Sequence, residues 1–449
     1  MAQPHELTLT QAAAALRAKE LSPVELVESL LRRTEALDSA LLAWATLTPE
    51  HAMEAARRAE LELFAGTVRS PIHGVPYGAK DIFDTAGIRT AGGTKIWAER
   101  VPDTDAAAIA TVNAAGAILL GKTHTTEFAD GDPAVSRNPW NATHTAGGSS
   151  TGSGVAVAAR LVPWAFGSQT VGSVLRPAAY NGVVGFKPTF GRISRRGVIP
   201  MAQTFDHVGV LTRCVEDAAT LLGVLAGRDP DDPDSADVPV DDYAAELDRR
   251  HGPRIGFIRT FFLDESDAET RMRMEQVAQE LAKAGATIEE IDPGIDFPHA
   301  FRSHRLMQES EMADWHEPLF VGNEKLYGPK ISAYIQNGFK NTAKEYVRAM
   351  NYRLEMRNLA SAALERVDAL LMPTAAGPAP QDLTQTGDTR FQSPWSFTGF
   401  PSISVPMGLA SNGLPLGAQF AGAPFQEARL LGVARWAEQV LAVELEPPL

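Results

Sequence analysis

The chain has 449 residues, 44% of them hydrophobic, and its 41 basic and 55 acidic residues give a formal net charge of −14. This composition predicts a large buried core, and the acidic balance argues against nucleic-acid binding and against docking on anionic membranes. Cys214 is the sole cysteine, which excludes an intrachain disulfide and a thiolate metal cluster. Because the sequence also lacks a signal-peptide pattern and an apolar run of about 18–20 residues, we expect a cytoplasmic protein without a membrane span.

The N-terminal part of the chain predicts three helices. The first covers 9–20, is rich in alanine and has Thr10 as its expected N-cap. The second begins at Ser22, because proline follows it at the first helical position and Glu25 completes a capping box. A third alanine-rich helix is expected over 50–66.

Strands then alternate with helices along the rest of the chain. The predicted strands are 117–123, 254–258, 287–291, 367–374 and 401–408, and the predicted helices are 105–116, 266–285 and 424–441. This alternation is typical of an α/β sandwich with helices on both faces of a sheet.

Two segments interrupt the alternation. The acids and prolines of 227–242 indicate a solvated surface loop, which we interpret as an excursion within one domain because the alternation resumes directly after it. The segment 300–345 carries six scattered aromatic side chains at roughly helical spacing, which favours core packing over a ligand pocket.

The stretch GGSSTGSG at 147–154 raises the question of function. No lysine follows its glycines, so it does not match a phosphate-binding loop. It contains G-x-S-x-G centred on Ser150, the nucleophile pattern of an α/β-hydrolase esterase, but the loop-like residues before it do not form the apolar strand that this motif requires. His207, His299 and His304 are the histidines that such an enzyme could use.

A third interpretation combines this stretch with two others. A second glycine–serine turn lies at 167–173 between apolar segments, and Lys80 stands in the mostly apolar GVPYGAKD. A buried lysine loses affinity for its proton, because desolvation disfavours the charged form. A neutral Lys80 amine could then act as general base through a serine of the first turn toward a serine of the second.

Together, three motifs resemble the amidase signature family of serine hydrolases. They are GVPYGAKD at 74–81, GGSSTGSGVAVAA at 147–159 and GSQTVGSVLRPAAYNGVVGFKPT at 167–189. The resemblance covers almost the whole chain. It implies a single large α/β/α domain over 1–449 with a central twisted mixed β-sheet flanked by helices. Its expected parts are a helical N-terminal segment (8–66), a catalytic core (70–225) and a C-terminal α/β part whose segment 300–345 contributes to the substrate pocket.

The resemblance also assigns roles. It implies that Ser173 is the nucleophile, Ser149 the bridging serine with a cis peptide bond before it, and Lys80 the base. The backbone N–H groups of Thr170, Val171, Gly172 and Ser173 are implied to form the oxyanion hole. Substrate contacts are expected at the following positions: Thr126, Glu127, Gly147, Gly148 and Arg176.

Three departures from the family pattern stand out in the second turn. Val171 replaces a common glycine, Gln169 replaces a common aspartate, and Leu175 occupies a usual arginine position with Arg176 one place later. The last departure argues against an acidic substrate and against the glutaminase subunit of a tRNA amidotransferase. Arg176 either ties down the turn or contacts substrate.

We therefore expect an amidase that cleaves a small, mainly apolar or aromatic amide or carbamate, with no metal and no cofactor. A carbamate or ester hydrolase of the same family, an esterase using Ser150 and a non-catalytic subunit remain the alternatives. A homodimer is expected from the family alone.

Overall fold

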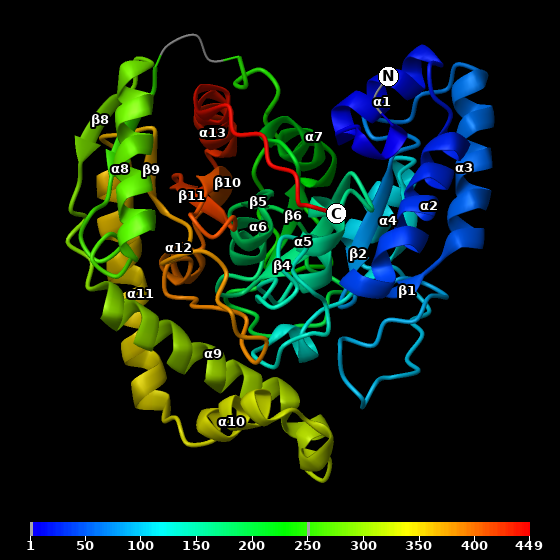
Figure 1. The fold of residues 1–449 in the computed structure, drawn as a ribbon. Coiled ribbons are helices and arrows are strands. Elements are labelled where there is room, and N and C mark those ends of the chain that lie inside the picture. The colour runs from blue at the N-terminus through cyan, green and yellow to red at the C-terminus, as the bar shows by residue number, and fades with distance from the viewer. Residues whose placement is uncertain (1–2, 249–251) are drawn as a thin grey trace.

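Eleven strands form one mixed sheet in the computed structural model, which describes residues 3–248 and 252–449 (Figure 1). In spatial order the strands are β1 (Trp44–Leu47), β3 (Ile118–Thr123), β2 (Pro76–Lys80), β4 (Trp164–Gln169), β6 (His207–Thr212), β5 (Val184–Lys187), β10 (Ser402–Leu409), β11 (Pro415–Ala421), β9 (Ala369–Pro373), β7 (Arg254–Phe257) and β8 (Thr287–Glu290).

Strand direction changes repeatedly across this sheet. β2 runs parallel to β3 and β4, and β7 runs parallel to β8 and β9. The remaining neighbours pair antiparallel, including β4 with β6 and β10 with β11. The expected α/β fold with a central mixed sheet flanked by helices is therefore confirmed.

Helices surround the sheet (Figure 1). They are α1 (Leu9–Ala18), α2 (Pro23–Leu41), α3 (Pro49–Phe64), α4 (Ala107–Ala114), α5 (Thr151–Ala158), α6 (Leu175–Asn181), α7 (Val215–Leu225), α8 (Ala268–Lys283), α9 (Phe297–Phe320), α10 (Pro329–Gly338), α11 (Ala343–Leu364), α12 (Ser393–Thr398) and α13 (Glu427–Leu441). The described residues also form three short 3₁₀ helices, η1 (Pro4–Glu6), η2 (Glu127–Ala129) and η3 (Glu324–Leu326). Across the described ranges, no helix is both long and apolar enough to cross a membrane.

The helix starts test the capping predictions. α2 has the predicted capping box between Ser22 and Glu25. The predicted N-cap Thr10 of α1 is wrong, because the cap is Thr8, whose side chain pairs reciprocally with Gln11. The N–H and hydroxyl of Thr10 instead donate to the buried carboxylate of Asp217 in α7.

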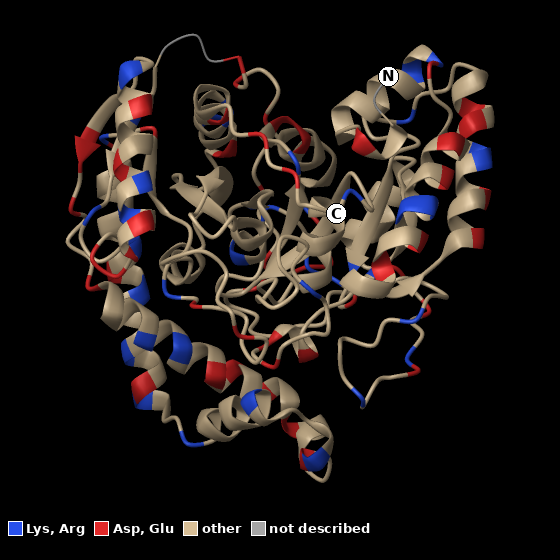
Figure 2. Ribbon diagram, viewed as in Figure 1, with Lys and Arg blue, Asp and Glu red and all other residues tan. Residues whose placement is uncertain are grey.

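Charged residues lie mainly on the outer helices, and the central strands are largely uncharged (Figure 2). Three lysines depart from this pattern. Lys80 in β2, Lys122 in β3 and Lys187 in β5 are all completely buried. Because burying an ammonium group is costly, each of these side chains needs hydrogen-bond partners inside the core.

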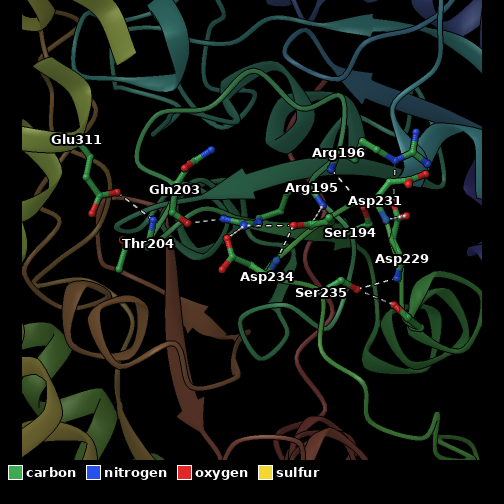
Figure 3. A network of polar contacts seen from close by, with 12 residues as sticks. Ser194, Arg195, Arg196, Gln203, Thr204, Asp229, Asp231, Asp234, Ser235 and Glu311 are labelled. Carbon is green, nitrogen blue, oxygen red and sulfur yellow. Dashed lines mark hydrogen bonds and ion pairs between the residues drawn. The ribbon is translucent and has the colours of Figure 1, made fainter. Parts of the chain in front are cut away.

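The loop 227–242 is more firmly attached than a solvated loop would be. Asp229 accepts hydrogen bonds from Ser194 (2.7 Å) and Arg196 (3.0 Å), and Arg195 forms ion pairs with Asp232 and Asp234 (Figure 3). Asp232 is itself buried. The prediction of a surface loop is confirmed for most of 227–242, including the exposed Asp231 and Asp234. It is wrong for Asp232, which is buried where the loop packs against the segment between β5 and β6.

Candidate active site

Lys80 stands at the end of β2, where its Nζ atom reaches two serines. The Nζ–Oγ distances are 2.7 Å to Ser149 and 2.7 Å to Ser168 of β4. Burial lowers the pKa of Lys80 well below its usual range, and the carboxylate of Asp206 opposes this shift only in part. Burial therefore weakens the affinity of this amine for its proton, and the amine faces two hydroxyl groups.

The partners of Lys80 set it apart from the other two buried lysines. Lys122 donates to the carbonyl of Phe83 and to Thr90, and Lys187 donates to the carbonyls of Pro188 and Phe400. Burial also lowers their pKa values, to about 8 for Lys122 and to about 7 for Lys187. Lys122 also contacts a hydroxyl, that of Thr90, but it lies 3.7 Å from the carboxylate of Asp81 as well. Only Lys80, among these three, has hydroxyl groups as its sole hydrogen-bond partners, and one of them, Ser149, lines a cavity.

The first glycine–serine turn places Ser149 beside this lysine. The peptide bond between Gly148 and Ser149 is cis. Gly147 has φ +76°, and a Cβ atom there would lie 2.9 Å from the backbone of Pro177, so this position requires glycine. The hydroxyl of Thr151 donates to the Gly147 carbonyl (2.9 Å), which fixes the turn to the first residue of α5.

Ser173 lies in the second turn, between β4 and α6. Its carbonyl accepts from the N–H of Ser150 (3.2 Å), a bond that joins the two turns directly. Ser149 and Ser173 line the same cavity of 330 Å³. None of the backbone hydrogen bonds found in the described ranges uses the N–H of Thr170, Val171, Gly172 or Ser173 as donor. Of these four residues, Val171 and Ser173 line the cavity.

Gln169 explains how the turn tolerates the loss of the family's aspartate. Its side-chain oxygen accepts from the N–H groups of Val174 (2.9 Å) and Leu175 (3.0 Å), at the start of α6. Its side-chain nitrogen donates to Ser396, whose hydroxyl in turn donates to the carbonyl of Val171 (2.8 Å). A carboxylate could not donate to Ser396, so the amide supports the turn from both sides.

Arg176 both holds the turns and faces the cavity. Its Nη2 atom donates to the carbonyl of Gly148 (2.6 Å) and to Thr386 (3.1 Å). Its Nε and Nη1 atoms have no hydrogen-bond partner in the described structure, although the side chain is buried. One part of the guanidinium is therefore structural, and the other part is free to bind a ligand.

Thr126 and Glu127, which were also expected to contact the substrate, lie in different places. The N–H of Thr126 donates to the carbonyl of Ser149 (3.3 Å), so Thr126 supports the first turn. The carboxylate of Glu127 accepts from Thr94 (2.8 Å) and from the N–H of Gly328 (2.7 Å), and it lines a separate cavity. The structure therefore does not bring Glu127 together with Ser173.

Ser150 does not occupy a nucleophile's position. It is completely buried, and its hydroxyl exchanges hydrogen bonds with the backbone of Ser168 (3.2 and 3.3 Å). His207 bonds to backbone carbonyls and His304 to Ser393, while the ring of His299 stacks on Tyr352. The esterase hypothesis with Ser150 as nucleophile is therefore wrong, because its hydroxyl contacts neither a base nor the cavity.

Polar and charged side chains form most of the cavity wall. They are Asp130, Ser149, Ser173, Arg176, Arg305, Gln308, Lys330, Tyr334, Gln385, Thr386, Asp388 and Thr389. Four of them come from the segment 300–345. Aromatic residues of that segment, such as Phe320 and Tyr327, pack in the core with Phe128 and Trp315, as their spacing favoured. The polar wall gives no support to the expected apolar or aromatic substrate.

Sequence reasoning missed three residues of this site. Ser168 is the second partner of Lys80, Gln392 packs against Gly172, and Asp130 lines the cavity. Ser168 stands in the same motif as Ser173, one residue before Gln169. Its position at the end of a buried strand was the feature of the sequence that could have indicated a place in the site. Gln392 lies 220 positions from Gly172, and no local pattern connects the two.

Comparison with known proteins shows to which protein family the chain belongs. The chain matches the family described as Amidase over residues 25–431. The protein belongs to the amidase family. At 36% identity it is similar to one of the subunits of the glutamyl-tRNA(Gln) amidotransferase of Geobacter sp., over 96% of both chains. It is also 36% identical to the putative amidase AmiD of Mycobacterium tuberculosis, over 99% of this chain and 96% of that protein.

Solved structures agree with this assignment. The X-ray structure of the peptide amidase from Stenotrophomonas maltophilia superposes with a TM-score of 0.85 at 33% identity, over 98% of both chains. The predicted resemblance to amidase signature enzymes is confirmed. As a member of this family the protein is an enzyme, a hydrolase of carbon–nitrogen bonds.

Proposed function

We propose that the protein is a serine amidase in which Ser173 is the nucleophile, Ser149 the proton bridge and Lys80 the base. The observation that carries this proposal is the completely buried Lys80 amine, 2.7 Å from the hydroxyl of Ser149. Ser149 in turn lines one cavity together with Ser173. A neutral amine at the end of two hydroxyl groups is what the activation of a serine requires.

Acylation begins when the Ser173 hydroxyl passes its proton to Ser149, while Ser149 passes its own proton to the Nζ atom of Lys80. The Ser173 oxygen forms a bond to the substrate carbonyl carbon, and the carbonyl electron pair moves to its oxygen. The N–H groups of Thr170 to Ser173 receive this oxyanion. Removal of one such donor typically costs about 100- to 1,000-fold in kcat.

The oxyanion then collapses and the C–N bond breaks. The proton on Lys80 returns through Ser149 to the leaving nitrogen, which departs as an amine or ammonia. In deacylation a water molecule attacks the ester carbon and gives its proton through Ser149 to Lys80, and Ser173 regains a proton as it leaves. Lys80 ends the cycle neutral, as it began.

The cavity favours a small, polar substrate. Its volume of 330 Å³ is at the lower end of ligand pockets, which typically span about 300–1,000 Å³. The unpartnered Nε and Nη1 atoms of Arg176 are hydrogen-bond donors that a carbonyl or carboxylate oxygen of the substrate would satisfy. A polar amide therefore replaces the apolar substrate expected from the aromatic residues.

A fluorophosphonate reagent followed by peptide mass mapping tests the proposal. We expect the adduct on Ser173. An adduct on another serine would overturn the assigned nucleophile, and the absence of any adduct would support a non-catalytic subunit. A panel of matched amides, anilides, esters and carbamates would then rank the substrate classes, with amides expected to give hydrolysis products. Faster turnover of carbamates would favour the carbamate hydrolase alternative.

A further inference from the structure

Asp130 closes one side of the cavity that contains Ser173, and an unusual backbone turn presents it there. The two preceding residues, Phe128 and Ala129, both have left-handed φ angles, of 46° and 64°. Such angles are uncommon for residues other than glycine. The turn is held by hydrogen bonds from Phe128 to Gly92 (2.8 Å), from Ala129 to Thr126 (3.0 Å) and from Asp130 to Glu127 (2.9 Å).

Aromatic packing stabilises this turn. The ring of Phe128 is completely buried and stacks on Tyr327 at 5.7 Å between centroids. It also makes edge contacts with Trp97, Trp315 and His316. Backbone outliers that the surroundings hold in place are concentrated at functional sites. The buried cluster thus keeps Asp130 at the cavity wall.

The carboxylate of Asp130 is buried and incompletely satisfied. The residue is only 7% exposed, and its Oδ2 atom has no hydrogen-bond partner among the residues described. Buried polar groups in proteins are nearly always hydrogen-bonded, so a buried carboxylate oxygen without a partner requires an explanation. Burial raises the pKa of Asp130 to about 7, with Asp132 and Glu309 acting in the same direction and Arg305 against it.

Among the other charged groups of the cavity wall, Arg176 is held through its Nη2 atom alone, by Gly148 and Thr386, and the remaining three have partners of their own. Lys330 donates to the carbonyl of Thr384 (2.5 Å), and the Arg305 guanidinium lies 4.2 Å from the ring centroid of Tyr334. Asp388 pairs with Arg390 at 2.8 Å. Asp130 is therefore the carboxylate of this wall that, within the described residues, lacks a counter-ion in direct contact.

We propose that Asp130 binds a protonated amine of the substrate, so that the enzyme selects amides that carry a primary ammonium group. The ammonium supplies N–H donors to the free carboxylate oxygen and neutralises its charge inside the cavity. This inference rests on the proposed function, because it assumes that the cavity beside Ser173 receives the amide.

The test uses the full chain and a series of ω-amino amides of increasing chain length, each paired with the alkyl amide in which a methyl group replaces the amine. We expect wild type to prefer at least one amine substrate over its partner. Asp130→Asn should reduce that preference in kcat/KM by roughly 10- to 100-fold, the effect of removing a charge-assisted hydrogen bond. Asp388→Asn is the matched control and should keep the preference, because Asp388 is already paired.

A second measurement does not depend on the variant folding. Alkylammonium ions should slow fluorophosphonate labelling of wild-type Ser173, and alcohols of the same length should not. Equal protection by both ligands, no amine preference at any chain length, or equal effects of the two aspartate variants would overturn the role of Asp130. Failure of wild-type Ser173 to react at all would instead refute the proposed function.

Discussion

Replacing Lys80 by methionine removes the proposed base and keeps much of the side-chain volume. Among the described residues, neither Ser149 nor Ser168 has another titratable side chain as hydrogen-bond partner at its hydroxyl. No second base can therefore take over the proton. General-base catalysis typically contributes about 100- to 10,000-fold, so Lys80→Met should lower kcat/KM by about that factor, which corresponds to roughly 3–5 kcal/mol in the transition state.

Lys187→Met provides the matched control. Lys187 is equally buried, and its pKa is also lowered, but its amine donates to the carbonyls of Pro188 and Phe400. Its loss should destabilise the fold by about 1–3 kcal/mol for each carbonyl left unpaired. Molecules that remain folded should hydrolyse amides at the wild-type rate.

The assay is steady-state hydrolysis of one amide, normalised to the folded fraction from circular dichroism. We expect a large loss for Lys80→Met and little loss per folded molecule for Lys187→Met. Wild-type turnover by Lys80→Met would refute the assignment of the base. Equal losses per folded molecule in the two variants would also contradict it, because Lys187 contacts neither Ser149 nor Ser168.

Three further substitutions test residues that position the base, the oxyanion hole and the substrate. Ser168→Ala should lower kcat about tenfold, the worth of one hydrogen bond to the base, and Ser168→Thr should restore the rate. Gly172→Ala places a Cβ atom 2.3 Å from Oε1 of Gln392 and should disturb the N–H groups of the oxyanion hole, so that kcat falls by about 100- to 1,000-fold. Adding Gln392→Ala should partly restore kcat, because it removes the clashing side chain. A double variant as slow as Gly172→Ala alone would contradict the clash. Arg176→Gln should lower kcat/KM by about 10- to 100-fold for amides that carry a second carbonyl or a carboxylate, relative to amides without one. An equal decrease in kcat/KM for the two kinds of amide would show that Arg176 has only a structural role.

Local patterns in the sequence predicted much of the fold. The capping box at Ser22 and the strand–helix alternation depend on neighbouring residues, so they could be predicted without knowledge of the tertiary structure. The start of α1 shows the limit of local patterns. Thr8 and Thr10 both precede the alanine run Ala12–Ala15, and the T-x-x-Q pattern of Thr8 and Gln11 was the signal that distinguished them. The choice is reinforced by Asp217, more than 200 residues away, which binds the N–H and hydroxyl of Thr10.

The candidate site also has parts that the sequence predicts and parts that it does not. Lys80, Ser149 and Ser173 belong to the three motifs that resemble the amidase signature family, and that resemblance implied that they act together. Burial alone would not have selected Lys80, since Lys122 and Lys187 are buried as well. What separates Lys80 is its set of partners, which depends on how strands β2 and β4 and the first turn meet.

The cavity wall was the least predictable part. It combines residues of α9, α10 and the loop 385–389 with the turn at Asp130, and these segments are distant in sequence. The spacing of the aromatic residues in 300–345 favoured core packing, and Phe320 and Tyr327 are indeed buried, but it did not indicate which polar residues of the segment line the cavity. Which face of a helix meets the cavity is decided by tertiary contacts, and the sequence of a single chain does not reveal them.

The pH dependence of fluorophosphonate labelling at Ser173 tests the central claim most directly, because labelling requires activation of the nucleophile and no substrate binding. The neutral form of Lys80 is the active one, so the wild-type rate should rise with pH and reach a plateau, with a midpoint well below 10.5, the value of an unperturbed lysine. Lys80→Met should lack this step. A wild-type midpoint near 10.5, or the same profile in Lys80→Met, would contradict activation by a buried, neutral lysine.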